Sequence, residues 1–275
     1  EPDDTAGSLS VRLAELGERA EQARGGLALI RGEAGIGKSR LLRELRDRLR
    51  TRRVALFEGR CQPALHDPYQ PFAEVLEKVL RSLPGLGGDR HEAILGEAGR
   101  LLRVLLPRLD ADLLLEADEG AGAGADRATA AAPDRDALLE GLCGVFERLS
   151  WAVPCVLLLE DLHWADEAAL ELLLRLADRL ASSRLAVFAT LRDDDPGAAE
   201  TPPAVQRLLA GLSASPACLT VALAPLAGRE VHEMVRALLG GDLDSPLLVE
   251  KLLEVSEGNP LYVNEVVRSL RESGE

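Results

Sequence analysis

The sequence contains little of what several functional classes require. Only 3% of its 275 residues are aromatic, and its four cysteines are scattered without a CxxC pair: Cys61, Cys143, Cys155 and Cys218. This spacing indicates reduced, buried thiols and argues against a zinc site or a disulfide framework. No apolar run approaches the roughly 20 residues of a membrane span, and no segment resembles a signal peptide. We therefore expect a cytoplasmic protein that does not contact a membrane.

Positive charge is also scarce. Lysine and arginine number 32 against 46 aspartates and glutamates, which gives a net charge of −14 and an isoelectric point near 4.9. Such a surface repels phosphate backbones, so we expect no direct nucleic-acid binding by this segment. Only Lys38, Lys78 and Lys251 are lysines, so a lysine inside a motif indicates a position at which arginine does not suffice.

Apolar runs of strand length alternate with segments of helical periodicity. Strands are predicted at 27–30, 53–58, 154–161, 184–191 and 219–223, and the run at 154–161 is apolar on both faces, as in the middle of a parallel sheet. Helices are predicted at 9–23, 39–50, 71–83, 91–106, 136–149 and 166–180, the last with Asp166 as its N-cap. This alternation predicts an α/β domain of three layers with a parallel sheet.

The pattern changes near residues 225–228. Beyond this point, helical segments follow one another with no strand pattern between them, at 229–239, 246–256 and 261–271. We expect an N-terminal segment with a helix (1–26), an αβα domain (27–226) and a small all-helical domain (227–275). Residues 117–134 are rich in Gly, Ala and Asp, which predicts a mobile loop.

The ends of the sequence bear on its completeness. It begins at Glu1, and its only methionine is Met234. We therefore expect it to be an excised part of a longer protein.

A phosphate-binding motif lies between the first predicted strand and the helix that follows. Residues 32–39 match G-x-x-x-x-G-K-[ST] in the strand–loop–helix context that this motif requires. Glycine permits positive φ, so successive N–H groups can face phosphate oxygens, and the helix N-terminus favours the same anion. The alternative, a glycine-rich turn that precedes a helix by chance, requires four fixed positions to coincide. The predicted nucleotide-binding residues are Gly32, Glu33, Ala34, Gly35, Ile36, Gly37, Lys38, Ser39 and Arg40.

Two acids, Glu160 and Asp161, end the predicted strand at 154–161. P-loop enzymes need one carboxylate here for the Mg²⁺ shell and another to polarise the attacking water. Solvated acids also end many strands, but the nearby phosphate loop favours the functional interpretation. We predict Ser39, Glu160 and Asp161 as the metal-binding residues. Which acid serves the metal and which the water stays open at this stage.

Arg192 follows the predicted strand at 184–191, whose end lies beside the γ-phosphate in sheets of this type. A surface arginine at a strand end is the alternative. The predicted catalytic residues are Lys38, Glu160, Asp161 and Arg192. Trp164 is interpreted as packing, whereas His163 is open between a hydrogen bond at a helix entry and a role in the site.

Four segments together resemble the ATPase modules of STAND-class P-loop proteins: GEAGIGKSRLL, LLLEDLHWAD, ATLRDDD and SEGNPLYVNEVV. The resemblance runs from Leu27 to Arg271. It is to modules in large ATP-binding LuxR-type transcriptional regulators and in related bacterial multidomain kinases and cyclases. Many families share the phosphate loop, whereas EDLHWAD and the Gly-Asn-Pro motif are more discriminating.

The resemblance implies an AAA+-like P-loop NTPase fold of αβα layers followed by a helical lid. Its Gly-x-Pro motif, here residues 258–260, would lie in the lid with Pro260 against the adenine. Family members usually act as switches, closed with ADP and open and self-associating with ATP, and slow hydrolysis resets them. Relatives carry a Gly-Arg-Glu segment before the first helix that helps to hold the adenine. Residues 7–13 lack it, so the choice between ATP and GTP stays open.

Three functional hypotheses follow. The first is a Mg²⁺-dependent switch module that binds ATP and hydrolyses it slowly within a multidomain signalling or transcriptional regulator. The second is a scaffold that retains ADP without turnover, and the third is an origin-recognition-like loader on DNA, against which the negative charge counts. The expected partners are the nucleotide, C-terminal domains of the longer parent chain and, in a nucleotide-dependent manner, further copies of the chain.

Overall fold

The computed structural model describes most of the chain. The described residues are 6–63, 68–82, 94–95, 135–193, 201–239 and 245–273. The predicted loop at 117–134 and almost all of the predicted helix at 91–106 lie outside them.

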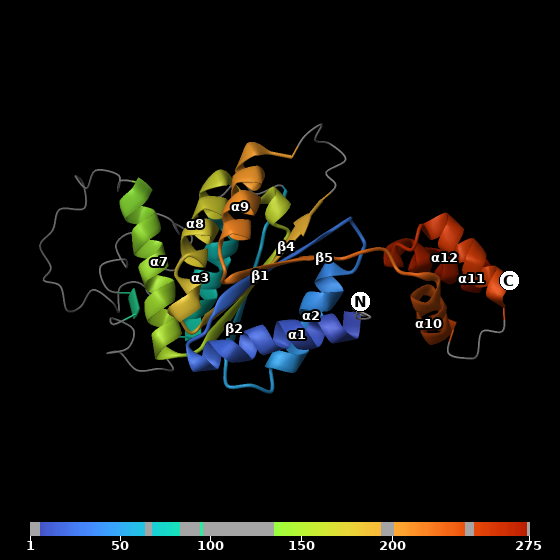
Figure 1. Ribbon diagram of the computed structural model, residues 1–275, viewed down its shortest axis with the longest axis horizontal. Helices are drawn as coiled ribbons and strands as arrows, with labels where there is room; N and C mark the ends of the chain where they lie inside the picture. The colour runs from blue at the N-terminus through green and yellow to red at the C-terminus, as the bar shows by residue number, and fades with distance from the viewer. Residues whose placement is uncertain are drawn as a thin grey trace, which may run out of the picture.

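A parallel sheet forms the centre of the molecule. Its five described strands are β1 (Gly26–Gly32), β2 (Ala55–Arg60), β3 (Cys155–Glu160), β4 (Leu185–Arg192) and β5 (Cys218–Ala222). They are arranged in the order β2-β3-β4-β1-β5, and every neighbouring pair is parallel (Figure 1). This order places β4 between β1, which leads into the phosphate loop, and β3, which ends in the two acids.

Helices cover both faces of the sheet. One face carries α1 (Ala6–Arg19) and α2 (Lys38–Leu49), and the other carries α3 (Gln70–Ser82), α7 (Arg135–Ala152), α8 (Glu167–Ala177) and α9 (Pro203–Ala214). Side chains of each strand alternate between the two cores, as the period of two in a strand requires. In β1, Leu27 and Leu29 belong to one core, whereas Ala28 and Ile30 belong to the other. The predicted three-layer αβα fold is confirmed.

Local sequence explains most of these elements. In α2, the four leucines Leu41, Leu42, Leu45 and Leu49 recur at helical spacing and are buried against the sheet. Helix α9 was not predicted, although Pro203 occupies its first turn and Val205, Leu208 and Leu212 line its buried face. The strands match the predicted runs to within a few residues.

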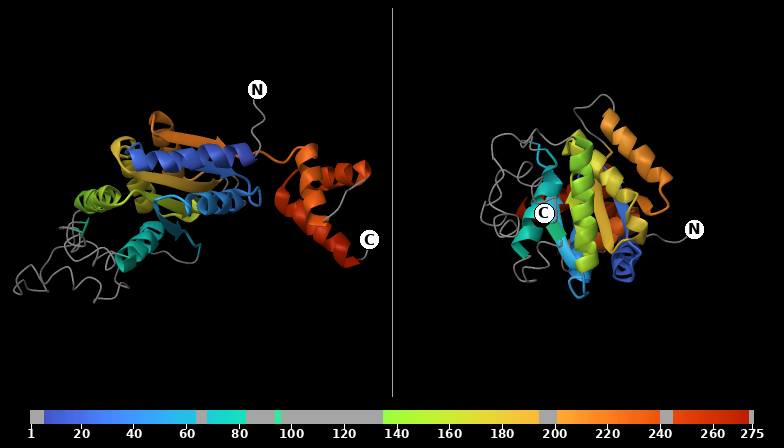
Figure 2. Two further views of the ribbon diagram at one scale, coloured as in Figure 1. Left: turned by 90° about the horizontal axis from the view of Figure 1, so that it is seen from below. Right: turned by 90° about the vertical axis from the view of Figure 1, so that its left-hand side faces the viewer.

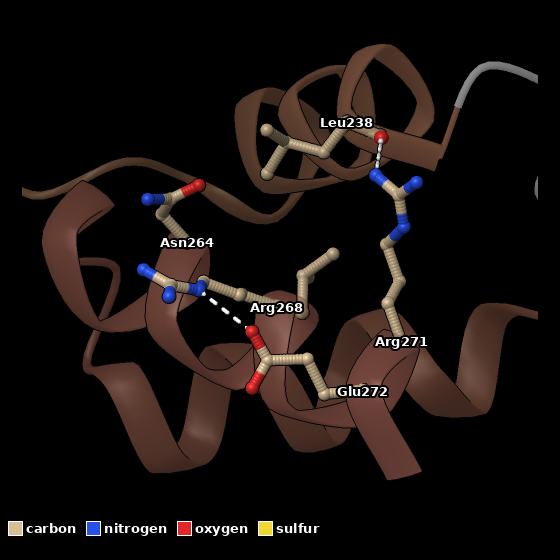
Figure 3. Close-up of a pocket in the computed structure, with 6 residues that line it drawn as sticks. Leu238, Asn264, Arg268, Arg271 and Glu272 are labelled. Carbon is tan, nitrogen blue, oxygen red and sulfur yellow. Dashed lines mark hydrogen bonds and ion pairs between the residues drawn. The ribbon is translucent and has the colours of Figure 1, made fainter. Parts of the chain in front are cut away.

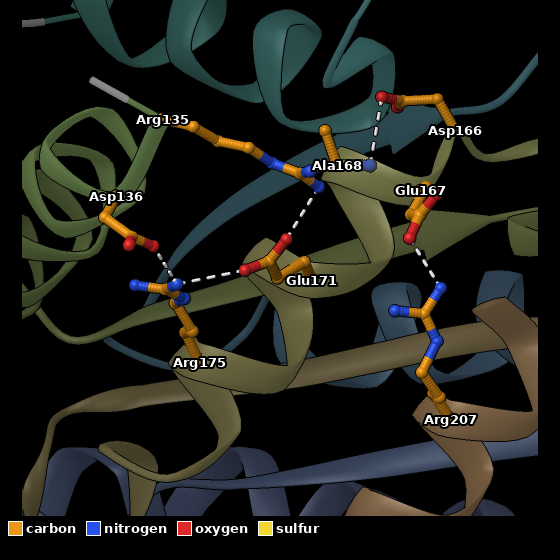
Figure 4. A network of polar contacts seen from close by, with 8 residues as sticks. All are labelled: Arg135, Asp136, Asp166, Glu167, Ala168, Glu171, Arg175 and Arg207. Atoms are coloured by element: carbon orange, nitrogen blue, oxygen red, sulfur yellow. Dashed lines mark hydrogen bonds and ion pairs between the residues drawn. The ribbon is translucent and has the colours of Figure 1, made fainter. Parts of the chain in front are cut away.

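Charged side chains connect the outer helices on one face. Arg175 bridges Asp136 of α7 and Glu171 of α8, and Arg207 of α9 pairs with Glu167 (Figure 4). Asp136, Arg207 and Glu167 are exposed, and Arg175 and Glu171 are partly exposed, so each pair contributes only about 0–1 kcal/mol to stability.

The last helices form a separate unit with a core of its own. Helices α10 (Gly228–Leu239), α11 (Pro246–Ser256) and α12 (Pro260–Ser273) pack together at one end of the molecule, set apart from the sheet (Figures 1 and 2). We call residues 228–273 the helical unit. Its buried side chains are Val231, Val235, Val249, Leu252, Val263 and Val267. The boundaries predicted at 26/27 and 226/227 stay predictions, and α1 packs with α2 against the sheet.

None of the described helices is both long enough and apolar enough to cross a membrane.

Candidate functional site

The carboxyl ends of four parallel strands bring the predicted residues to one edge of the sheet. Gly32 at the end of β1 pairs in register with Arg192 at the end of β4. Glu160 at the end of β3 pairs with Arg60 at the end of β2. Ligands of open α/β sheets bind at such an edge, so this is where the site is built.

The loop between β1 and α2 depends on three glycines. Gly32, Gly35 and Gly37 have φ of 151°, 81° and 108°, in the region that residues with a side chain avoid. A Cβ at Gly35 would also lie 2.7 Å from the Cβ of Leu261, whereas a Cβ at Gly37 would meet nothing within 4 Å. Helix α2 begins at Lys38, so its N-terminal N–H groups and positive dipole end face this loop.

The Lys38 side chain lies against the backbone of the loop. Its ammonium donates hydrogen bonds to the carbonyl oxygens of Gly32 and Glu33, each at 2.7 Å, and the residue is 7% exposed. These bonds fix a compact positive charge against the loop backbone, where an anion on the loop amides would meet it. Of the other predicted loop residues, Ile36 is buried, whereas Glu33 and Arg40 are exposed.

Ser39 and Glu160 are in direct contact. The Ser39 hydroxyl donates to a Glu160 carboxylate oxygen at 2.8 Å, across 121 residues of sequence. Hydroxyl and carboxylate oxygens are hard donors of the kind that Mg²⁺ prefers. Within the described ranges, no group of three or more His, Cys, Asp and Glu side chains is arranged to hold a metal. The pair therefore fits a Mg²⁺ ion that takes its remaining ligands from phosphate and water.

Asp161 has different surroundings from its neighbour. It lies in the left-handed region (φ 62°, ψ 44°), and its N–H donates to the Thr190 hydroxyl at 2.9 Å. One of its carboxylate oxygens accepts from Arg60 Nε at 3.1 Å and from Arg60 Nη2 at 3.0 Å. The Asp161 side chain is 8% exposed and that of Arg60 is 57% exposed. Asp161 also raises the pKa of the Arg60 guanidinium above its ordinary value, chiefly through the hydrogen bond.

Sequence reasoning missed Arg60 and Thr190. Thr190 is the one polar residue within the apolar run of β4, and it is 1% exposed. Arg60 ends β2 as Glu160 ends β3. Both signals were present in the sequence, but they become meaningful only when the strand order is known.

Arg192 lies against an aromatic ring. Its guanidinium carbon is 5.1 Å from the centre of the Trp164 ring, a cation–π contact. The ring of His163 lies 4.3 Å from that of Trp164. Trp164 is 37% exposed and contacts the predicted site residue Arg192, so its interpretation as a packing residue stays a prediction.

Asp193, which follows Arg192, pairs with Arg31 at 2.6 Å, and its N–H donates to the Gly32 carbonyl at 3.3 Å.

The start of α12 also reaches the loop. Pro260 is the first residue of α12, and Gly258, with φ of 78°, follows the end of α11. Asn259 between them donates from its side-chain amide to the Ala34 carbonyl at 2.9 Å. This asparagine was not among the predicted site residues.

One cavity lies away from this site. It has a volume of about 420 Å³ and lies between α10 and α12 of the helical unit (Figure 3). Its lining residues are Leu238, Asn264, Val267, Arg268, Arg271 and Glu272, none of which is a predicted site residue.

The comparison with protein families decides the class of the chain. Residues 10–188, more than half of it, match the model of the AAA ATPase domain. The chain belongs to the AAA ATPase domain family. This AAA ATPase domain has the P-loop class that the sequence predicted, while its membership in a LuxR-type regulator stays a prediction.

A relative of this AAA ATPase domain is a much longer protein. An uncharacterised protein of Rhizobium meliloti (strain 1021) is 30% identical over 196 residues, which are 66% of this chain and 17% of that protein. The chain thus spans less than a fifth of the length of this relative.

Solved structures resemble the domain in fold. A Drosophila ORC structure bound to DNA aligns with 96% of this chain and 55% of its own, at 14% identity and a TM-score of 0.51. A signal transduction ATPase with numerous domains (STAND) and a tetratricopeptide repeat sensor, from Pyrococcus horikoshii, aligns with 92% of this chain and 28% of its own, at 16% identity and a TM-score of 0.49.

Proposed function

We propose that this AAA ATPase domain binds ATP with Mg²⁺ and hydrolyses it slowly, as the switch module of a multidomain signalling or transcriptional regulator. The observation that carries the proposal is the contact of Ser39 with Glu160 beside the Lys38 ammonium, at the end of a loop with three positive-φ glycines. These groups are what a phosphate–Mg²⁺ pair requires, and they meet at one edge of the sheet.

Each residue has a distinct task in this proposal. The loop amides and the N-terminus of α2 bind the phosphates, and Lys38 adds a positive charge. Ser39 and Glu160 hold the metal, because they already share a hydrogen bond. Bound Mg²⁺ supplies charge neutralisation of the phosphates and orients them. Arg192 stabilises charge on the terminal phosphate, since β4 lies between the strands that carry the loop and the acids.

Asp161 is assigned to the attacking water. A carboxylate that orients water must have an oxygen available to it, and one oxygen of Asp161 is held by two donors of Arg60. Both Arg60 donors use the same oxygen, so the other oxygen is left for water, but the two bonds restrict how far the carboxylate can turn toward the phosphate. Loosening of the Arg60–Asp161 pair would therefore limit the rate of hydrolysis, which gives a physical reason for slow turnover.

The same pair supports a second candidate, a module that retains nucleotide without hydrolysing it. If Arg60 never releases Asp161, the site binds and does not turn over. This candidate shares every binding residue with the first and differs from it only in whether phosphate is released.

The proposal extends to partners. Several large apolar side chains of the helical unit are exposed, among them Leu247 (62%), Val255 (69%) and Tyr262 (57%). Exposed apolar side chains of this kind support contacts with further domains of the parent chain or with other copies when nucleotide binds. The choice between ATP and GTP is left to measurement.

The deciding experiment compares two of the three lysines of the chain. Lys38→Ala should weaken binding of ADP and ATP at least about 100-fold, because charge-assisted hydrogen bonds to phosphate are lost. Lys251→Ala, an exposed lysine of α11, removes the same charge and should leave binding unchanged. Calorimetric titration with ADP, ATP and GTP measures both variants. Equal affinity of the wild type and Lys38→Ala would refute the proposal.

The two acids can be separated in the same way. Glu160→Gln should abolish the gain in ATP affinity that Mg²⁺ confers, whereas Asp161→Asn should retain that gain and lose phosphate release. Titrations with and without Mg²⁺, together with a phosphate-release assay, give both readouts. Exchanged behaviour of the two variants would reverse the assignment of the acids.

A further inference from the structure

Asn259 holds the phosphate loop and the start of α12 at once. Its side-chain amide nitrogen donates to the Ala34 carbonyl at 2.9 Å, 225 residues away in sequence. Its side-chain oxygen accepts from the N–H of Leu261 at 3.1 Å, which makes it the N-cap of α12. The residue is 5% exposed. The nitrogen of this buried amide therefore binds the phosphate loop, and its oxygen binds the helical unit.

The bond to Ala34 fixes the direction of a neighbouring donor. The Ala34 carbonyl and the Gly35 N–H belong to one planar trans peptide, so they point in opposite directions. When Asn259 binds the carbonyl, the Gly35 N–H is turned away from the helical unit. Glycine at φ of 81° would otherwise let this peptide rotate at little cost.

Packing prevents Asn259 from moving independently of the helical unit. A Cβ at Gly35 would lie 2.9 Å from the Asn259 side-chain oxygen, which shows how closely the loop and α12 meet. The Gly258 carbonyl accepts from the Leu226 N–H at 2.8 Å, and the Asn259 N–H donates to the Ser256 carbonyl at 2.8 Å. A shift of Asn259 must therefore move the junction of α11 and α12.

We infer that Asn259 is a positioning residue that couples nucleotide binding in the phosphate loop to the placement of the helical unit. It holds the Ala34–Gly35 peptide with its N–H turned toward the phosphate-binding side, and a nucleotide that uses this N–H stabilises the same peptide orientation. By linkage, the nucleotide then strengthens the attachment of α12 to the loop. The inference rests on the proposed nucleotide binding and adds a residue and a direction of coupling to it.

Two variants remove the donor and keep the cap. Asn259→Asp retains an oxygen for the Leu261 N–H and loses the N–H₂ group that binds Ala34. Asn259→Ser also caps a helix, is uncharged and is too short to reach Ala34, so it separates loss of the donor from a negative charge near phosphate. If one variant does not fold, the other still tests the inference.

A matched control lies in the same unit. Ser245 caps α11 through the N–H of Leu248 at 3.4 Å. Ser245→Ala should loosen a helix of the helical unit without touching the loop, so nucleotide affinity should stay at the wild-type value.

The measurements are ADP affinity by calorimetry and hydrogen exchange of the α12 amides with and without ADP, on the 275-residue chain. In the wild type, ADP should slow exchange in α12. In Asn259→Ser, affinity should fall about three- to ten-fold, the effect of one hydrogen bond, and the slowing should disappear. Wild-type affinity together with undiminished slowing in both variants would overturn the inference alone. Absence of ADP binding by the wild type would overturn the proposed function and this inference with it.

Discussion

Two neighbouring carboxylates differ because of their partners. Glu160 accepts a hydroxyl hydrogen bond from Ser39, whereas Asp161 is buried and paired with a guanidinium. The left-handed backbone of Asp161 turns its side chain away from the direction that the strand would give it. The order of the acids in the sequence therefore does not determine their tasks. We propose that the contact with Ser39 marks the metal-binding acid and the contact with Arg60 the acid that orients water.

Replacement of Arg60 tests this division. Arg60→Gln should raise phosphate release several-fold with unchanged ADP affinity, because Asp161 is freed to orient water. It should also lower the free energy of unfolding by about 1 kcal/mol, since a buried carboxylate loses a partner that is itself half exposed. Phosphate-release assays and urea unfolding measure the two effects.

The controls for Arg60 are internal. Arg207→Gln removes an exposed cation from the surface pair with Glu167. It should leave phosphate release unchanged and should change the free energy of unfolding by no more than about 0.5 kcal/mol. Slower phosphate release in Arg60→Gln would mean that Arg60 assists hydrolysis instead of restraining it. No phosphate release from either the wild type or Arg60→Gln would favour the non-hydrolysing module.

Single residues were predictable where the motif is local. The glycines, Lys38 and Ser39 are neighbours in sequence, and the spacing of their motif specifies the loop. Arg60 and Asn259 act on residues 101 and 225 positions away, so no local pattern contains them. Their partners are determined by which strand ends and helix starts meet, and that depends on the fold.

At the scale of elements, Asp166 joins two segments beside the site. One of its oxygens accepts from the Ala168 N–H at 3.2 Å and caps α8, as predicted. The other accepts from the Tyr69 N–H at 3.1 Å, just before α3. Tyr69 has φ of 59°, a strained conformation for a bulky residue, and its N–H is held there by Asp166.

Asp166→Ala should therefore cost about 2 kcal/mol of unfolding free energy, from a lost cap and a lost hydrogen bond. Asp166→Ser keeps a cap but not the reach to Tyr69, and should cost about half as much. Urea unfolding of the two variants measures the difference. An equal loss in both would show that the Tyr69 contact contributes nothing.

Helices and strands were predictable where their apolar residues form a clear pattern in the sequence. Buried strands such as β3 and β4 are continuous apolar runs and were found to within two residues. Helix α9 was missed because its apolar face consists of only three buried residues that follow a pair of prolines. The buried faces of the helices in the outer layers can be recognised only when the position of the sheet is known.

At the scale of the whole molecule, the core keeps its thiols protonated. Burial raises the pKa of Cys61 and Cys155 from 9.0 to about 12 and that of Cys143 to about 11. In the unfolded chain these thiols ionise near pH 9, whereas in the folded protein they retain their protons. The unfolded state therefore binds fewer protons above pH 9, and stability falls as the pH rises toward 12.

Cys155 isolates this effect. In the wild type the Cys155 thiol should lower the free energy of unfolding by roughly 1 kcal/mol per pH unit between pH 9.5 and 11, because it keeps most of its proton in the folded state and loses most of it in the unfolded state. Cys155→Ala should show a slope smaller by that amount, whatever other groups titrate in both proteins. Urea unfolding across this pH range gives the slopes. Parallel curves for the two proteins would contradict a raised pKa at Cys155.

The strand order has a consequence for synthesis. In the sheet, Gly26 of β1 faces Ala186 of β4, and Leu27 faces Cys218 of β5, so both neighbours of β1 come from the later part of the chain. A ribosome that has just released the glycine loop has not yet made either strand, and an unpaired apolar strand is prone to aggregate. The nascent chain therefore contains the phosphate-binding motif for a long interval before β1 has a neighbouring strand to pair with. A chain terminated before β4 would contain the motif but lack the sheet that positions it.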